Sequence, residues 1–186
     1  VTVKLGILEL ETGNTKWVDL GEKQDIYLPR VKWVPDSSGI FFQKENRGQT
    51  KLELIFADAN TAETSAVLTE ISDTWINLNH GLTFLKNGAE FLWQSERSGY
   101  SHIYHYRNDG TLINQLTDGK WVVNGSISAN EQKSEVYFIG NATDYLERHL
   151  HSVALDSDKE NSPKRISKRA GWHTVSISGD SQRYID

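Results

Sequence analysis

Hydrophobic and polar positions along this chain form short apolar stretches separated by polar turn residues, from one end of the sequence to the other. One pattern recurs four times: an apolar strand, a polar hairpin and a second apolar strand. Anchored on Trp33, Phe84, Ile127 and Ile177, it repeats at steps of 51, 43 and 50 residues. A repeat of this length that contains only strands and turns indicates a β-propeller, with one blade per repeat.

The repeat predicts an all-β fold, a partial β-propeller of about three to four blades that are four-stranded antiparallel sheets. Closed propellers usually have four to eight blades, so we expect the chain to be a piece of a longer protein. An opened ring would expose blade faces and a sheet edge, which favours self-association. We expect one domain over residues 1–186, with a partial blade at 1–25, full blades at 26–70, 71–118 and 119–168, and a partial blade at 169–186.

Turn residues and unbroken apolar runs support this interpretation. The segments 35–39 (PDSSG) and 86–88 (KNG) combine a fixed φ, polar side chains that cap turns, and a glycine. The run Phe91–Trp93 lacks strict alternation, because both faces of an interior blade are expected to be buried. Residues 144–148 are expected to form one helical turn within a loop.

Composition narrows the possible functions. The chain has 37% hydrophobic residues and a net charge of −5, which is typical of soluble globular proteins and disfavours nucleic-acid binding. Its local basic cluster, Lys164-Arg165 and Lys168-Arg169, is interpreted as a solvated loop and strand edge. No apolar run approaches the roughly 20 residues of a membrane span. The absence of cysteine excludes disulfides and thiol chemistry from this chain.

Catalytic and cofactor motifs are missing from the sequence. It contains no Gly-x-Ser-x-Gly elbow, no P-loop and no dinucleotide-binding glycine pattern, so we expect neither a catalytic nucleophile nor a cofactor in this chain. His149 and His151 lie two apart on an expected strand and share a face, a spacing compatible with zinc. No third ligand is apparent, and we expect no metal.

The connections between blades are the best candidates for contact with a ligand or a partner, because they lie on one rim of a propeller. Residues 75–81 form one such connection, and residues 27–30, 121–124 and 172–173 hold equivalent places. Each carries an aromatic residue close to an inner strand. We expect these rings to stack between blades.

Three segments carry a resemblance to a known family: 27–36 (YLPRVKWVPD), 91–104 (FLWQSERSGYSHIY) and 115–123 (QLTDGKWVV). They resemble the propeller of dipeptidyl peptidase IV-like serine peptidases, which belong to the prolyl oligopeptidase superfamily. The likeness is closest to bacterial members and extends over nearly the whole chain, from about Lys4 onward. The segment 91–104 is its most specific part.

The resemblance implies an eight-bladed propeller above a C-terminal α/β-hydrolase domain, with the substrate in the cavity between them. Such enzymes release N-terminal dipeptides with proline or alanine in second place. Their catalytic Ser, Asp and His lie in the hydrolase domain, and a glutamate pair that binds the substrate's amine lies upstream of Val1. The chain is therefore expected to be a non-catalytic wall that gates and positions the peptide. Its parent is expected to be periplasmic or secreted, and often homodimeric.

The resemblance also implies a candidate site. In animal members the loop that corresponds to residues 75–80 contributes an arginine and an aromatic residue to the extended substrate pocket. This chain has a shorter loop with different residues. The residues expected close to the substrate are Trp75, Asn77, Leu78, Asn79 and His80.

An alternative is a propeller scaffold of the WD40 or TolB type, which would serve protein–protein interaction without an enzyme. It fits the repeat equally well, because a fold does not determine function. It does not account for the segment 91–104.

Overall fold

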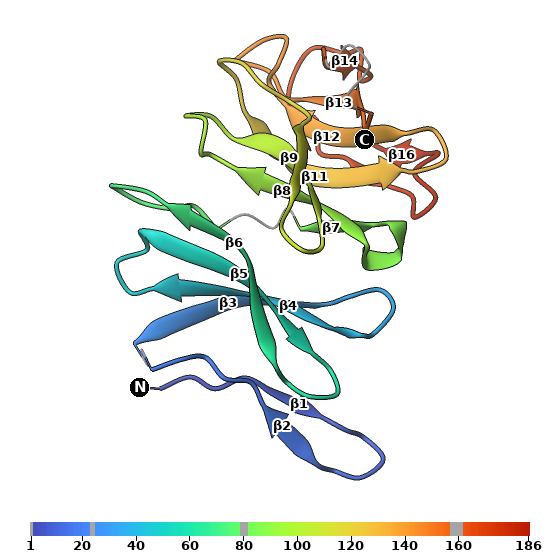
Figure 1. The fold of residues 1–186 in the computed structure, drawn as a ribbon. Coiled ribbons are helices and arrows are strands. Elements are labelled where there is room, and N and C mark those ends of the chain that lie inside the picture. Colours follow the sequence, from blue (N-terminus) through green and yellow to red (C-terminus); the bar gives the residue numbers. More distant parts are fainter. Residues whose placement is uncertain (1, 23–24, 79–81, 157–161) are drawn as a thin grey trace. The chain divides into compact units, whose positions relative to one another are not determined.

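The computed structural model describes residues 2–22, 25–78, 82–156 and 162–186 (Figure 1). Within these ranges the chain is all β, apart from one short 3-10 turn, η1 (Lys86–Gly88). It divides into two compact units, residues 1–78 and 79–186, and the prediction of one domain over the whole chain stays a prediction. No helix in the described ranges is long and apolar enough to cross a membrane.

The first unit contains a strand pair and a four-stranded antiparallel sheet in which sequence neighbours are hydrogen-bonded. Alternate residues of the second strand of this sheet, Ile40 and Phe42, form one hydrophobic cluster with Val18, which directly follows the strand pair, and with Ile7 from the pair itself. The strand pair therefore covers one face of the sheet. The strands are β1 (Gly6–Leu8) and β2 (Thr15–Trp17) in the pair, and β3 (Ile26–Trp33), β4 (Gly39–Asn46), β5 (Lys51–Asp58) and β6 (Thr64–Ile71) in the sheet.

The second unit contains two four-stranded antiparallel sheets and a strand pair, again ordered as in the sequence. The first sheet has β7 (Thr83–Leu85), β8 (Glu90–Ser95), β9 (His102–Arg107) and β10 (Leu112–Gln115). The second sheet has β11 (Val123–Asn130), β12 (Glu135–Gly140), β13 (His149–Ala154) and β14 (Lys164–Arg165). The pair is β15 (Ser176–Ile177) and β16 (Tyr184–Ile185). These sheets confirm the all-β, propeller-type fold class.

The sheet β11–β14 is buried on both faces. Val136 and Phe138 of β12 belong to the cluster shared with β7–β10, whereas Tyr137 and Ile139 pack in the cluster that includes Val175. Successive side chains of a strand point to opposite faces, so a strand enclosed on both sides has buried side chains at successive positions, as Phe138 and Ile139 of β12 show. This is why the centre of β12 appears as an unbroken apolar run rather than as an alternating one.

The predicted hairpins are confirmed, and the close strand packing beside one of them explains why its last residue is a glycine. A Cβ atom on Gly39 would lie 2.4 Å from the Ala57 carbonyl oxygen, so only glycine lets β4 approach β5 this closely. Asn87, in η1 between β7 and β8, has a φ of 54° and is followed by Gly88 at 97°. Asparagine and glycine tolerate this left-handed region best.

The expected helical turn at residues 144–148 is wrong. The Asp144 side chain accepts the Leu146 N–H at 2.8 Å, and the Asp144 carbonyl accepts the Glu147 N–H at 3.3 Å. An aspartate that bonds backbone groups ahead of it favours a turn over a continuing helix. The chain bends at Tyr145 and Leu146 and then enters β13.

The packing predicts a large cost for shortening Phe138. This ring is fully buried between sheets and stacks on Trp121 and His151. We expect Phe138→Ala to lower the free energy of unfolding by about 3–5 kcal/mol, measured by urea denaturation. Leu10→Ala, at an exposed turn, is the control and should stay within about 0.5 kcal/mol of the parent sequence. Equal losses in both variants would contradict this account of the core.

Candidate functional site

The segment predicted to lie close to the substrate is held at its start by backbone hydrogen bonds. The Ser72 N–H donates to the Thr50 carbonyl at 2.9 Å, and the Ile76 N–H donates to the Gln49 carbonyl at 2.8 Å. Between these anchors the Trp75 side chain is 58% exposed. Asn77 is exposed and Leu78 half-buried, whereas Asn79 and His80 lie outside the described residues.

Equivalent backbone bonds occur in both sheets of the second unit. The Val123 N–H donates to the Ser101 carbonyl at 2.8 Å, and the His173 N–H donates to the Arg148 carbonyl at 3.0 Å. In each blade, therefore, the connection after the fourth strand is bonded to the start of the third strand. We call each such set of bonds a clasp. It supplies partners for backbone groups that no sheet ladder can satisfy.

In the second unit each clasp also contains a hydroxyl and a histidine. The Ile103 N–H donates to Thr117 Oγ1 at 3.0 Å, and His102 Nδ1 lies 3.1 Å from the same oxygen. His102 Nε2 lies 3.0 Å from the Gly119 carbonyl, which can only accept. The proton of a neutral His102 is therefore on Nε2, and Thr117 donates to Nδ1.

The clasp of the next blade repeats this chain of bonds with a carboxylate at its end. The Leu150 N–H donates to Ser167 Oγ at 3.1 Å, Ser167 Oγ lies 2.9 Å from His149 Nδ1, and His149 Nε2 lies 2.7 Å from Glu147 Oε2. The other carboxylate oxygen, Glu147 Oε1, accepts the Gly171 N–H at 3.0 Å. The hydrogen bond from His149, with further contributions from Gly171 and Arg165, lowers the pKa of Glu147 below its ordinary 4.5.

The order Ser167–His149–Glu147 is that of a serine hydrolase relay, yet its environment excludes nucleophilic catalysis. Ser167 is 2% exposed and His149 is fully buried, so no substrate carbonyl can reach the hydroxyl. Thr117 and His102 make the same arrangement with a plain carbonyl as the last acceptor. We interpret both relays as structural. Sequence reasoning missed them because their members lie 15 and 18 residues apart.

The first unit has no such relay at the corresponding positions. Glu53 stands where the other third strands carry histidine, and it bonds Lys51 at 2.9 Å. Thr69 on β6 is exposed, and its register partner on β5 is Glu53. In this unit β6 stays paired with β5 as far as Ile71. Backbone carbonyls of β6 therefore accept the N–H groups that, in the second unit, bond to a hydroxyl after β10 or β14 ends.

The aromatic residues of the connections differ in their roles. Trp121 stacks on Phe138 at 5.8 Å between ring centroids and meets the His102 ring edge-on at 5.0 Å, which confirms stacking between blades. Trp172 instead is exposed, and Tyr27 lies inside β3 under the Arg47 guanidinium. Stacking between blades is therefore wrong for Trp172, because it lies on the surface of the second unit.

The histidine pair considered for zinc is engaged in structural bonds. His151 Nδ1 lies 2.9 Å from the His149 carbonyl, and its ring stacks on Phe138. Burial lowers the pKa of His151 to about 4, so it is neutral at physiological pH. The described part of the chain contains no cluster of three or more His, Cys, Asp or Glu residues suited to a metal ion.

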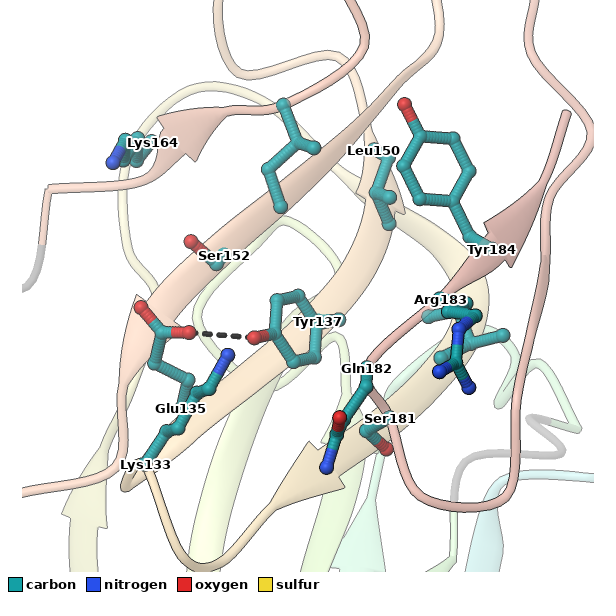
Figure 2. Close-up of a pocket in the computed structure, with 12 residues that line it drawn as sticks. Lys133, Glu135, Tyr137, Leu150, Ser152, Lys164, Ser181, Gln182, Arg183 and Tyr184 are labelled. Carbon is teal, nitrogen blue, oxygen red and sulfur yellow. Dashed lines mark hydrogen bonds between the residues drawn. The ribbon is translucent and has the colours of Figure 1, made fainter.

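A pocket of about 250 Å³ lies between the sheet β11–β14 and the pair β15–β16 (Figure 2). The hydroxyl of Tyr137 donates to Glu135 at 2.5 Å, and burial together with Glu135 raises the pKa of Tyr137 to about 12. This phenol stays protonated at neutral pH and is no base or nucleophile. Lys133, Lys164 and Arg183 contribute to its lining. Nothing in the sequence pattern indicated this pocket.

Comparison with known proteins identifies the family. A family model described as the dipeptidyl peptidase IV (DPP IV) N-terminal region matches residues 1–186. The chain belongs to this family. It is 28% identical over 170 residues to dipeptidyl peptidase 4 of Trichophyton rubrum, with 88% of this chain and 22% of that protein covered. It is 24% identical to the "Probable dipeptidyl peptidase 4" of Emericella nidulans, with 98% of this chain and 27% of that protein covered.

A solved structure supports the same fold. Dipeptidyl peptidase 4 of Porphyromonas gingivalis superimposes with a TM-score of 0.88 at 22% identity, covering 99% of this chain and 26% of that chain. The chain thus spans about a quarter of the length of these relatives. Its resemblance to dipeptidyl peptidase IV propellers is confirmed, whereas the bacterial origin suggested by the sequence stays a prediction.

The relay in the clasp predicts a specific cost for removing one hydroxyl. Thr117→Val leaves the buried Ile103 N–H and His102 Nδ1 without their partner, so we expect a loss of about 1–3 kcal/mol in unfolding free energy. Thr69→Val, at the corresponding exposed position, is the matched control and should change stability by less than about 0.5 kcal/mol. Chemical denaturation measures both. The relay has no energetic role if the two variants are indistinguishable.

The Glu147 carboxylate predicts acid sensitivity. Its pKa is lowered in the folded state, so its stabilising contribution is present above the unfolded value near 4.5 and is lost as pH falls through the folded value. We expect Glu147→Gln to be less stable than the parent sequence at neutral pH, with the difference shrinking below about pH 4.5. Urea midpoints from about pH 7 to about pH 3 measure this. A difference that grows on acidification would show that the sign is wrong.

Proposed function

We propose that the chain is a non-catalytic propeller segment of a dipeptidyl peptidase IV-like serine exopeptidase. In this proposal it walls the substrate cavity, admits peptide termini and positions them for a C-terminal α/β-hydrolase domain. The support is the family match across all 186 residues, together with sheets of propeller type. The parent would release N-terminal Xaa-Pro or Xaa-Ala dipeptides.

Burial of the relays supports a role without catalysis for this segment. A nucleophile must be reachable by the substrate and must have its attacking oxygen unencumbered. Ser167 meets neither condition, because it is buried and already accepts the Leu150 N–H. The chemistry of the parent would then lie in its hydrolase domain.

The clasp at residues 72–76 supports a role for the 75–80 loop near the substrate. Bonds on both sides of Trp75 fix the backbone, so an exposed ring is presented from a rigid base. Pre-organised aromatic side chains make low-entropy contacts with a flexible peptide. We propose Trp75, Asn77, Leu78, Asn79 and His80 as the substrate-proximal residues.

Further properties of the parent follow from the same proposal. It would be exported to the periplasm or beyond, and it would form homodimers. Its reading frame should encode two adjacent glutamates upstream of Val1 and a Gly-x-Ser-x-Gly elbow downstream of Asp186, followed by Asp and His. A reading frame without a hydrolase domain would support the scaffold alternative instead.

Because the proposal places catalysis in another domain, it predicts different activities for the isolated chain and for the full-length parent. The 186-residue chain should not hydrolyse a Gly-Pro chromogenic substrate, whereas the full-length parent should. In the parent, we expect Trp75→Ala to raise KM for peptides longer than a dipeptide roughly fivefold, with kcat changed less. The reason is that Trp75 would contact the peptide beyond the reacting bond.

Trp17→Ala, which removes another exposed tryptophan of the same unit, is the control and should leave KM unchanged. Turnover by the isolated chain would refute the assignment of catalysis to another domain. A fall in kcat alone for Trp75→Ala would contradict a contact with the bound peptide.

A further inference from the structure

An exposed apolar cluster lies beside the clasp of β13. It consists of Tyr145, Leu146 and Trp172, whose side chains are 84%, 80% and 70% exposed. The first two lie in the loop between β12 and β13, and Trp172 lies in the connection between β14 and β15. Large apolar residues that gather on a surface, rather than lie scattered, mark an interaction site.

This cluster is held in place before any partner arrives. Trp172 Nε1 donates to the Leu146 carbonyl at 2.8 Å, and the Arg148 guanidinium lies 4.0 Å from the Trp172 ring centroid. The backbone beneath is fixed by the Arg148–Gly171 and Arg148–His173 hydrogen bonds. Trp172 and Arg148 are therefore held in a fixed arrangement, and together with Tyr145 they have the composition of an interface hot spot.

The charges around the cluster are mostly basic, with one exposed carboxylate, Asp144, whose Oδ1 accepts the Leu146 N–H at 2.8 Å. Arg148, Lys168 and Arg169 form no ion pair within the described residues. The nearby Glu147 carboxylate is occupied by His149, Gly171 and Arg165. The cluster therefore fits a surface that carries apolar side chains and acidic residues at its edge.

The size of the cluster favours a partner in the same polypeptide. An aromatic side chain buries roughly 150–250 Å², so the three residues offer on the order of 400 Å². A stable complex of separate chains needs about 800 Å² per partner. A tethered domain needs less, because its effective concentration reaches about millimolar. In the relatives, about three quarters of the chain lies outside the matched region, which supplies such a domain.

We propose that Tyr145, Leu146 and Trp172, flanked by Arg148, form the surface on which the C-terminal domain of the parent chain docks. This inference rests on the proposed function for the existence of that domain. It adds the docking residues and the chemistry of their counterpart, an apolar surface rimmed by acidic residues.

Photo-crosslinking of the full-length parent tests the proposal. With p-benzoylphenylalanine in place of Tyr145, we expect an intrachain crosslink to a peptide outside residues 1–186, identified by mass spectrometry. The same group at Leu10, which is also highly exposed, is the control and should not reach that peptide. A crosslink between two copies, a crosslink only within residues 1–186, or no crosslink would overturn the proposal.

Substitution provides an independent readout. In the full-length parent, Leu146→Ser with Trp172→Ser should accelerate amide exchange of the crosslinked peptide roughly tenfold. Tyr145→Ser, which removes no side-chain hydrogen bond within the described residues, should act in the same direction. Trp17→Ser is the matched control. Exchange rates equal to that control would overturn the docking surface.

Dipeptide release by the unsubstituted parent is measured in parallel. Its absence together with the intrachain crosslink would refute the proposed function and retain the docking surface. Dipeptide release together with exchange rates equal to the control would retain the proposed function and refute the docking surface.

Discussion

Burial of both faces of a sheet is the constraint on which the second unit depends. Phe138 fills the space between β7–β10 and β11–β14, while Tyr137, its neighbour on β12, faces the pair β15–β16. Such a sheet has no solvent side, so the buried polar side chains of its strands, such as His149 and His151 of β13, need hydrogen-bond partners within the protein. Buried polar residues in the second unit therefore occur as bonded sets, such as Thr117 with His102.

The clasps lie at one end of each sheet, where they supply the hydrogen-bond partners that burial makes necessary. Where β10 and β14 stop early, a hydroxyl takes the place of a backbone carbonyl and a histidine orients that hydroxyl. Where β6 runs further, the ladder itself is sufficient. The same need for hydrogen-bond partners is met by two routes in neighbouring repeats.

The clasps also connect structure to function. Because they fix the connections between blades, they present Trp75 and Trp172 from a rigid backbone, while Trp121 is drawn into the core by Phe138. Equivalent positions in the repeat thus acquire different roles. One tryptophan stabilises the stack, and the exposed ones are those proposed to contact a peptide or another domain.

The sequence by itself determined the strands, the hairpins and the family. These depend on local chemistry, such as the Asn87-Gly88 turn, and on a repeat that can be counted. Pairings between residues far apart were decided only by the tertiary structure. The Ser167–His149–Glu147 relay and the cluster around Trp172 require β13, β14 and the following connection to meet in space. Hydrophobic periodicity records which face of a strand is buried, but it does not record which loop lies beside that strand.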